Sequence, residues 1–150
     1  MKKKRILALF LAAVSCLSLA VSASAAGTTT RKATDFKDYD RTAWYAEAVS
    51  AAVDNGLLYG KSSSIIDPNG DMTRAEMAAI INRSFGCYAK ADISKYKDVS
   101  KDKWYFEDVA MAVQMGTYNG RSNSIMAPDA PITRQEAMTV VARALELDYD

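Results

Sequence analysis

The stretch Thr73-Arg74-Ala75-Glu76 occurs again 60 residues later as Thr133-Arg134-Gln135-Glu136. It belongs to a longer repeat, since residues 36–83 align with residues 96–143 without a gap and 18 of the 48 paired positions are identical. Self-similarity at a fixed offset indicates one supersecondary unit that is used twice. The sequence therefore predicts two tandem copies, repeat 1 over residues 36–91 and repeat 2 over residues 92–150, preceded by a short linker over residues 27–35.

The quoted stretch has the pattern of a helix start. In a capping box, the N-cap threonine hydroxyl accepts a hydrogen bond from the N3 amide, and the N3 glutamate accepts one from the N-cap amide. Thr73 with Glu76, and Thr133 with Glu136, fit this pattern, so all four are predicted to be structural caps. An apolar face follows in each copy, at Met77, Ala78, Ile80 and Ile81 and at Ala137, Met138, Val140 and Val141.

Another helix is predicted earlier in each copy, starting near Trp44 and near Trp104. Apolar residues recur at helical spacing from both tryptophans onward. Gly56 and Gly116 follow, where a left-handed C-terminal cap is expected. Each copy therefore has the pattern helix, loop, helix, and the expected fold is all-α with about four main helices plus short turns. The two apolar faces comprise Trp44, Ala48, Val49, Ala52 and Val53, and Trp104, Val109, Ala112 and Val113.

The loop of repeat 1 contains Asp67, Asn69 and Asp71, a run of oxygen ligands that suggests calcium. An EF-hand beginning at Asp67 needs glycine and glutamate where Met72 and Ala78 stand. Repeat 2 does not preserve the three oxygen ligands, and the chain contains no histidine, which is the commonest general base and metal ligand. The sequence therefore predicts no metal, no cofactor and no catalytic residue.

Residues 1–26 are predicted to be a cleaved secretory signal peptide. Basic residues 2–5 precede the apolar stretch 6–21 and the small-x-small site Ala23-Ser24-Ala25. A retained membrane anchor and lipidation at Cys16 are the alternatives, and we expect no membrane attachment after cleavage. The remaining chain has 15 basic and 18 acidic residues, a net charge of −3, with no basic run typical of nucleic-acid binding. Cys87 is then the single cysteine, so no intramolecular disulfide is expected.

Arg74 and Arg134 occupy the first helical position, where the helix dipole disfavours a cation. A surface arginine can lie there with its stem on apolar surface and its head in water. Alternatively, arginine together with the free amides of a helix N-terminus forms an anion site. Trp44 and Trp104 also have two interpretations, as core aromatics or as rings open to a groove, where they could stack on a sugar.

Together these motifs resemble the S-layer homology family. The resemblance implies a helical module that anchors bacterial surface proteins to secondary cell-wall polysaccharide, often through pyruvylated sugars. It also implies three repeats around a pseudo-threefold axis, with ligand grooves between neighbours. This chain has two repeats, so an incomplete bundle is expected. The motifs are Phe36-Lys37-Asp38, Trp44-Tyr45, Gly56 to Gly60, Asp67-Pro68 and Thr73 to Glu76, and Tyr96-Lys97-Asp98, Trp104-Tyr105, Gly116 to Gly120, Ala127-Pro128 and Thr133 to Glu136.

The resemblance also implies which residues bind the glycan. The family's groove aspartate, tryptophan and glycine have counterparts in both copies, and so does the arginine of the threonine-arginine-x-glutamate motif. Lys61 and Arg121 follow the groove glycines and are expected to add cations. The complete set is Asp38, Trp44, Gly60, Lys61 and Arg74 in repeat 1, and Asp98, Trp104, Gly120, Arg121 and Arg134 in repeat 2.

The predicted function is a non-catalytic cell-envelope module of a secreted bacterial protein, located in the cell wall or S-layer, with secondary cell-wall polysaccharide as its partner. The alternative is a self-association module of a surface layer without direct glycan recognition, in which open repeat faces pair with a second copy or with other chains of the family. A hydrolase that uses Glu47, Glu107, Asp38 and Asp98 is disfavoured, because no acid/base pair stands out. No nucleic-acid partner is expected.

Overall fold

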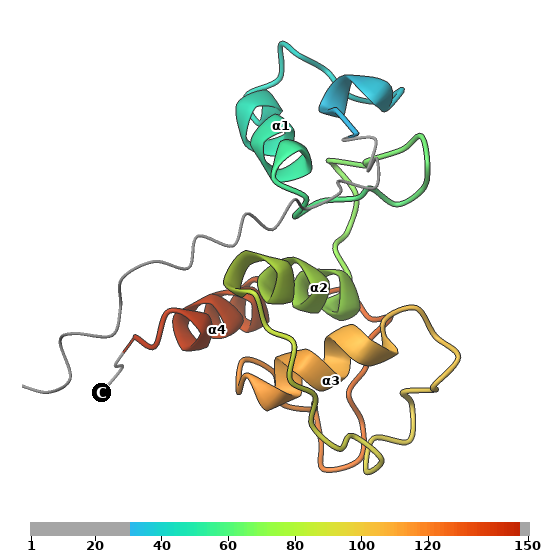
Figure 1. Ribbon diagram of the computed structural model, residues 1–150, viewed down its shortest axis with the longest axis vertical. Coiled ribbons are helices and arrows are strands. Elements are labelled where there is room, and N and C mark those ends of the chain that lie inside the picture. Colours follow the sequence, from blue (N-terminus) through green and yellow to red (C-terminus); the bar gives the residue numbers. More distant parts are fainter. Residues whose placement is uncertain (1–30, 148–150) are drawn as a thin grey trace, which may run out of the picture.

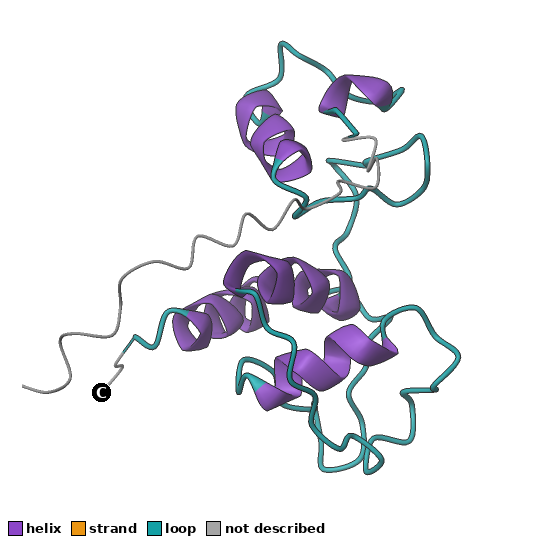
Figure 2. Cartoon of the chain, viewed as in Figure 1, coloured by secondary structure: helices purple, strands orange, loops and turns teal. Residues whose placement is uncertain are grey.

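The computed structural model of the chain describes residues 31–147, and over this range the fold is helical with no strand. The expectation of an all-α fold built from tandem repeats is confirmed (Figure 2). The predicted signal peptide, residues 1–26, and the first part of the predicted linker lie outside the described residues. The elements are the 3-10 helix η1 (Ala33–Asp35) and the α-helices α1 (Ala46–Asp54), α2 (Arg74–Phe85), α3 (Phe106–Gln114) and α4 (Arg134–Ala144).

Both predicted capping boxes are present. The Thr73 hydroxyl accepts from the Glu76 amide at 3.2 Å, and the Thr73 amide donates to Glu76 Oε2 at 2.7 Å. At the start of α4 the corresponding distances for Thr133 and Glu136 are 3.2 Å and 2.9 Å. The threonine and glutamate of each motif therefore define where α2 and α4 begin, as the sequence predicts.

The first helix of each repeat begins two residues later than its tryptophan. Tyr45 and Tyr105 are the N-caps of α1 and α3, and the preceding tryptophans are 95% and 60% exposed. Placing the tryptophans on the apolar helix faces was therefore wrong. Tyr105 is the buried aromatic instead, at 2% exposure, and its hydroxyl donates to Asp129 at 2.8 Å. Each tryptophan ring lies outside, edge to face with its tyrosine.

One aspartate in each repeat holds the loop that follows the first helix. The Asp38 carboxylate accepts from the amides of Ile66 and Asp67 at 2.9 Å and 2.7 Å. Asp98 does the same in repeat 2, at 2.9 Å from Met126 and 2.6 Å from Ala127. These bonds fix the turn where Asp67 and Ala127 adopt positive φ angles of 57° and 56°. Because such backbone is unfavourable for residues other than glycine, the turn needs this external support.

Each repeat has the expected order of helix, loop and helix. The two helices of one repeat nevertheless do not pack against each other. α1 packs against η1, whereas α2 crosses over and packs against α3 and α4 of repeat 2 (Figure 1). We call residues 31–72 the first lobe and residues 73–147 the second lobe. α2 packs on repeat 2 because the second lobe offers carbonyl acceptors and an apolar surface to the start of α2. The loop 67–72 lets α2 reach them.

Each lobe has its own apolar core. The cores differ in size because α2 contributes to the second one only. In the first lobe, Ala33, Phe36, Val53 and Ile66 are buried together. The larger second core contains Ala75, Ala78 and Ile81 from α2 together with Ile93, Tyr96, Val99, Tyr105, Val109, Ala110, Ala112, Tyr118, Met126 and Val140.

Arg74 joins α2 to repeat 2. Its side chain is buried, at 4% exposure, and its guanidinium donates to the carbonyls of Met126 and Asn119, both at 3.0 Å, and to Glu136 Oε1 at 2.9 Å. The guanidinium also lies over the Tyr118 ring, 5.2 Å from its centroid. Burying a charge is unfavourable unless it is paired and hydrogen-bonded, and here all three nitrogens have protein acceptors. Arg74 is thus a structural residue.

The first prediction compares the two motif arginines. Arg74→Ala should destabilise the chain by about 3 kcal/mol, since it removes one partner of a buried pair and leaves the acceptors unpaired. Arg134→Ala, at the equivalent but exposed position, should change stability by less than about 0.5 kcal/mol. Urea unfolding of dilute protein, followed by circular dichroism, measures both. Equal effects would contradict the structural role of Arg74.

Candidate functional site

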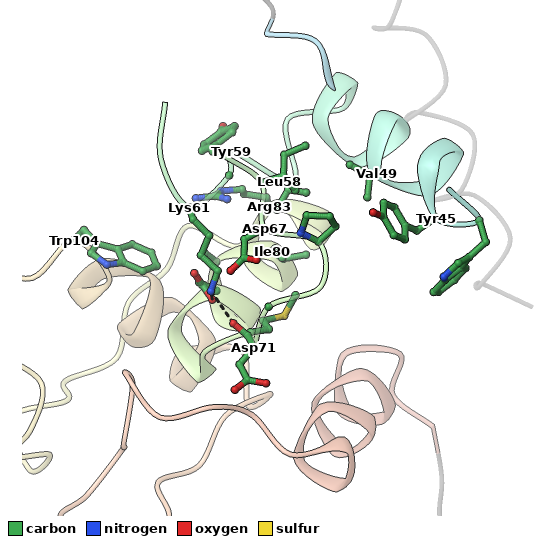
Figure 3. Close-up of a pocket in the computed structure, with 18 residues that line it drawn as sticks. Tyr45, Val49, Leu58, Tyr59, Lys61, Asp67, Asp71, Ile80, Arg83 and Trp104 are labelled. Carbon is green, nitrogen blue, oxygen red and sulfur yellow. Dashed lines mark hydrogen bonds and ion pairs between the residues drawn. The ribbon is translucent and has the colours of Figure 1, made fainter. Parts of the chain in front are cut away.

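A cavity of about 550 Å³ lies between the two lobes. Trp104 and Lys61 lie at one end of it and Tyr45 and Val49 at the other, with Arg83 between them (Figure 3). We call the end formed by Tyr59, Lys61, Glu76, Arg83 and Trp104 the repeat-1 groove. It combines an exposed indole with two cations, which is a suitable surface for a sugar that carries an acid group.

The cations of the repeat-1 groove are held by carbonyls and by one carboxylate. Lys61 Nζ donates to the Asp71 carbonyl at 2.7 Å and to Glu76 Oε2 at 3.1 Å. Arg83 donates to the Leu57 carbonyl at 3.0 Å, and its guanidinium lies 4.1 Å from the centroid of the Tyr59 ring. The lining of the full cavity also includes the carboxylates of Asp67, Asp71 and Glu76. Carboxylates therefore outnumber the two cations in this cavity.

A second cavity, of about 260 Å³, lies at the equivalent place in repeat 2 and has the opposite charge balance. We call it the repeat-2 groove. Three arginines line it, Arg74, Arg121 and Arg143, against one carboxylate, that of Glu136. Arg121 holds Glu136 in a two-point contact, with Nε 2.9 Å from Oε1 and Nη2 3.0 Å from Oε2. One carboxylate thus serves two arginines, and the groove keeps an excess of positive charge.

Tyr118 lines the repeat-2 groove and has an unusual hydroxyl. The side chain is 2% exposed, and its hydroxyl is buried without a hydrogen-bond partner among the described residues. Burial raises the pKa of Tyr118, so the group stays protonated and can donate. Buried polar groups without a partner are rare. A buried water, or an oxygen of a bound molecule that reaches the hydroxyl, would satisfy this one.

Glu136 is the most perturbed carboxyl in the described part of the chain. The hydrogen bonds from Arg121, the bond from the Thr133 amide and the charge of Arg74 lower its pKa from 4.5 to about 2. Glu136 is therefore ionised at neutral pH, where it has no proton to donate. Its role is to hold two arginines at the wall of the groove.

The comparison with known proteins identifies the family. The S-layer homology domain matches the chain twice, over residues 35–78 and 95–138. The chain belongs to the S-layer homology family.

Relatives of this S-layer homology chain are much longer proteins. It is 36% identical over 118 residues to the surface-layer 125 kDa protein of Lysinibacillus sphaericus, which covers 75% of this chain and 10% of that protein. It is 30% identical over 148 residues to a cell surface protein of Thermoanaerobacter kivui, 93% of this chain and 19% of that protein. An endoglucanase of Bacillus sp. (strain KSM-635) is 27% identical over 145 residues, 95% of this chain and 15% of that enzyme.

The expected location at the bacterial cell surface, in association with the cell wall, is confirmed by the family and by these surface-layer relatives. Between Arg31 and Leu147, no helix is long and apolar enough to cross a bilayer. The same residues contain no group of three or more side chains that could hold a metal ion.

The structure gives several residues implied by the S-layer homology resemblance a structural environment. Asp38 and Asp98 have their carboxylates occupied by loop amides, and these bonds lower the pKa of Asp38. A Cβ atom on Gly60 would lie 2.5 Å from the Phe36 ring. On Gly120 it would lie 2.5 Å from the Tyr96 ring. Both glycines are therefore required for loop packing, and both also line a cavity, Gly60 the large one and Gly120 the repeat-2 groove. The carboxylates of Asp38 and Asp98 are engaged by the loop amides.

The motif arginines of the two S-layer homology repeats are in different environments. The amide of Arg74 donates to Ala130 O at 3.0 Å and the Ala75 amide to Pro128 O at 2.9 Å, so the start of α2 has no free donors for an anion. The expectation that Arg74 lies at the surface beside free helix N-terminal amides is therefore wrong. Arg74 lines the repeat-2 groove, and its role as a glycan ligand stays a prediction. Arg134 is exposed at the start of α4. Its role as a ligand stays a prediction.

Sequence reasoning missed several groove residues, among them Tyr118, Arg83 and Arg143. Tyr118 pairs with Leu58 in the repeat alignment, so no recurrence marks it. Arg83 and Arg143 form one of the identical pairs, and that recurrence was the signal available. In contrast, Trp104, Lys61 and Arg121, which the resemblance implies, do line the two grooves. Trp44 lines the far part of the large cavity.

The second prediction concerns acid stability. Glu136 has a lower pKa in the folded chain than in the unfolded chain, so its contribution is fully present above about pH 4.5 and is lost as the pH falls toward about 2. Glu136→Gln keeps a capping oxygen but removes the charge. The variant should be less stable than the wild type at pH 7, and the difference should shrink between pH 4.5 and pH 2. Thermal unfolding across this range measures it, and parallel pH profiles would contradict the assignment.

Proposed function

We propose that this chain anchors a cell-surface protein to the wall by binding anionic secondary cell-wall polysaccharide, without catalysis. The observation that carries the proposal is the repeat-2 groove: three arginines against one carboxylate, beside a buried tyrosine hydroxyl that lacks a partner. An acidic sugar, such as a pyruvylated one, presents both a carboxylate for the arginines and oxygens for the hydroxyl. Charge-assisted hydrogen bonds of this kind are the strong ones in recognition.

The repeat-1 groove supports the same function by a different contact. Trp104 is 60% exposed and lies at the end of the cavity that contains Lys61 (Figure 3). An indole face open to a groove can pack against the C–H face of a sugar ring, while the ammonium group of Lys61 meets its acid group. We propose that this groove binds a second unit of the same polymer, more weakly because of its carboxylates.

A hydrolytic function is poorly supported by the candidate carboxylates. The oxygens of Asp38 and Asp98 are used by loop amides in separate lobes. Glu107 pairs with Lys90 on the surface of α3, and Glu47 is exposed on α1. A glycosidase needs two carboxyl groups facing one bond across a cleft. The arrangement favours binding of sugar over its cleavage.

The third prediction tests the Tyr118 hydroxyl. Tyr118→Phe removes a group that has no partner in the protein, so stability should be unchanged or slightly raised. Binding of a pyruvylated wall fragment should weaken about fivefold to tenfold, the equivalent of one hydrogen bond of about 1 kcal/mol. Calorimetric titration of folded protein measures the affinity.

Tyr96→Phe is the matched control, because the Tyr96 hydroxyl accepts from the Gly120 amide at 3.2 Å. This variant should lose about 1 kcal/mol of stability and retain binding once folded. If Tyr118→Phe bound the fragment as tightly as the wild type, the repeat-2 groove would not be the site.

The fourth prediction concerns charge. Arg121→Ala or Arg143→Ala should weaken binding by about 1.5–3 kcal/mol for each engaged arginine. Raised salt should weaken the wild type more than either variant, since exposed charges are screened. A neutral, pyruvate-free fragment should bind the wild type and the variants alike. Affinity that does not respond to salt would exclude an electrostatic mode of binding.

A further inference from the structure

The packing of α2 on repeat 2 shows which hydrogen bonds a helix that begins with the threonine-arginine-x-glutamate motif makes with the following repeat. Its amides and its arginine use five acceptors there: the carbonyls of Ala130, Pro128, Met126 and Asn119, and the Glu136 carboxylate. α4 starts with the same threonine-arginine-x-glutamate motif. Yet the amides of Arg134 and Gln135 have no hydrogen-bond partner between residues 31 and 147.

The first lobe contains the equivalent acceptors, at positions 60 residues earlier in the sequence. The counterparts of the five acceptors are the carbonyls of Gly70, Pro68, Ile66 and Tyr59 and the Glu76 carboxylate. Within the described range, the carbonyls of Gly70, Pro68 and Ile66 accept no hydrogen bond, and Glu76 uses Oε2 but not Oε1. Tyr59 O accepts from Arg31 at 3.3 Å and retains a second lone pair. These five groups form a complete docking site for a helix that begins with the arginine motif, and no described helix occupies it. We call this docking site the seat.

Burial shows the same complementarity. Where α2 covers α3, Tyr105, Val109 and Ala112 are 2%, 2% and 0% exposed. Their counterparts in the first lobe, Tyr45, Val49 and Ala52, are only partly buried, and the first two line the large cavity.

The docking face of α4 is correspondingly open. Arg134 and Gln135 are exposed, and Met138 is 63% exposed, whereas their counterparts Arg74 and Ala78 are 4% and 0% exposed. Methionine is flexible and fills irregular gaps, so Met138 is suited to a cavity of this kind. The chain thus carries one uncovered helix and one uncovered seat with matching groups.

We propose that a second copy of this chain fills the seat. α4 of one copy docks on the first lobe of the next, with Arg134 donating to Ile66 O, Tyr59 O and Glu76 of that copy. A second copy is the occupant because one chain carries both halves of the contact in the register its own α2 uses. The contact is head to tail, so it either closes into a ring or continues as a filament.

The docked copy also completes the repeat-2 groove of its neighbour. Within one chain, repeat 2 receives α2 of repeat 1. The Trp104 of repeat 2 then lines the groove of repeat 1 that contains Lys61 and Arg83. By the same geometry, the copy that receives α4 brings its Trp44, which is 95% exposed, to the groove of Arg121 and Arg143 in the copy that donates α4. This consequence for binding rests on the proposed glycan function. The association itself does not.

Two variants each remove one half of the contact. Arg134→Ala weakens the donor helix and leaves the seat intact. Ser50→Arg blocks the seat, since Ser50 is the counterpart of Ala110, which is 2% exposed in the core that α2 and α3 share. Asp54→Arg is the matched control: it adds an arginine to the same helix at its exposed last position, as Gln114 is exposed on α3.

Analytical ultracentrifugation over about a hundredfold range of protein concentration measures the association, which follows mass action. Wild type and Asp54→Arg should associate, and each single variant should be monomeric or bind about tenfold more weakly, as expected for the loss of a charge-assisted bond. An equal mixture of Arg134→Ala and Ser50→Arg should form a heterodimer that grows no further, since one intact contact remains between the two variants.

Three results would overturn the proposal: a wild type that stays monomeric, single variants that associate like the wild type, or a mixture that stays monomeric. In the second measurement, the heterodimer should bind a pyruvylated wall fragment more tightly than either variant alone. Association without that gain would reject the completed groove and leave the head-to-tail contact standing. Binding that is lost while association persists would instead count against the proposed function.

Discussion

The fold depends on the buried guanidinium of Arg74. A cation at 4% exposure is tolerated only when its nitrogens are paired, and all of its partners come from repeat 2. The arginine therefore fixes α2 on the second lobe and leaves α1 to the first. The structural boundary falls within repeat 1, near residue 73, and not between the two sequence repeats. The repeat in the sequence and the packed lobe in the structure are therefore offset from each other.

The same interaction determines where ligands can bind. Arg74 reaches Glu136 from one side while Arg121 reaches it from the other, and the shared carboxylate leaves the repeat-2 groove with surplus positive charge. In repeat 1 the corresponding carboxylate, Glu76, meets Lys61 alone. Identical motifs thus produce unequal sites, because an incoming arginine from another repeat is present at one and absent at the other.

Local features of the fold were predictable from the sequence, and the long-range pairing was not. Capping boxes at Thr73 and Thr133 and the glycine caps, with φ of 68° at Gly56 and 77° at Gly116, depend on neighbours within a few residues. The partner of α2 depends on acceptors about 50 residues away, and apolar periodicity says nothing about which surface covers a helix. Helix-dipole reasoning also misled, because it treated Arg74 as exposed.

The candidate site was predictable to a similar degree. The family resemblance indicated Lys61, Arg121 and Trp104, which do line the grooves. It also indicated Gly60 and Gly120, which pack within the loops and line the cavities as well. Asp38 and Asp98, which it included too, are engaged by loop amides. Tyr118 could not have been found by comparing the repeats, because its counterpart is leucine. Its unpartnered hydroxyl is visible only once burial is known.

The most direct test of the account is native-state hydrogen exchange resolved to single amides. If α2 belongs to the second lobe, its amides should exchange with the same opening free energy as those of α3, and the Ala75 amide, which donates to Pro128, should be protected with them. The amides of α1 should open separately and at lower free energy, because the first core is small. Exchange of α1 and α2 as one cooperative unit, with α3 apart, would contradict the account.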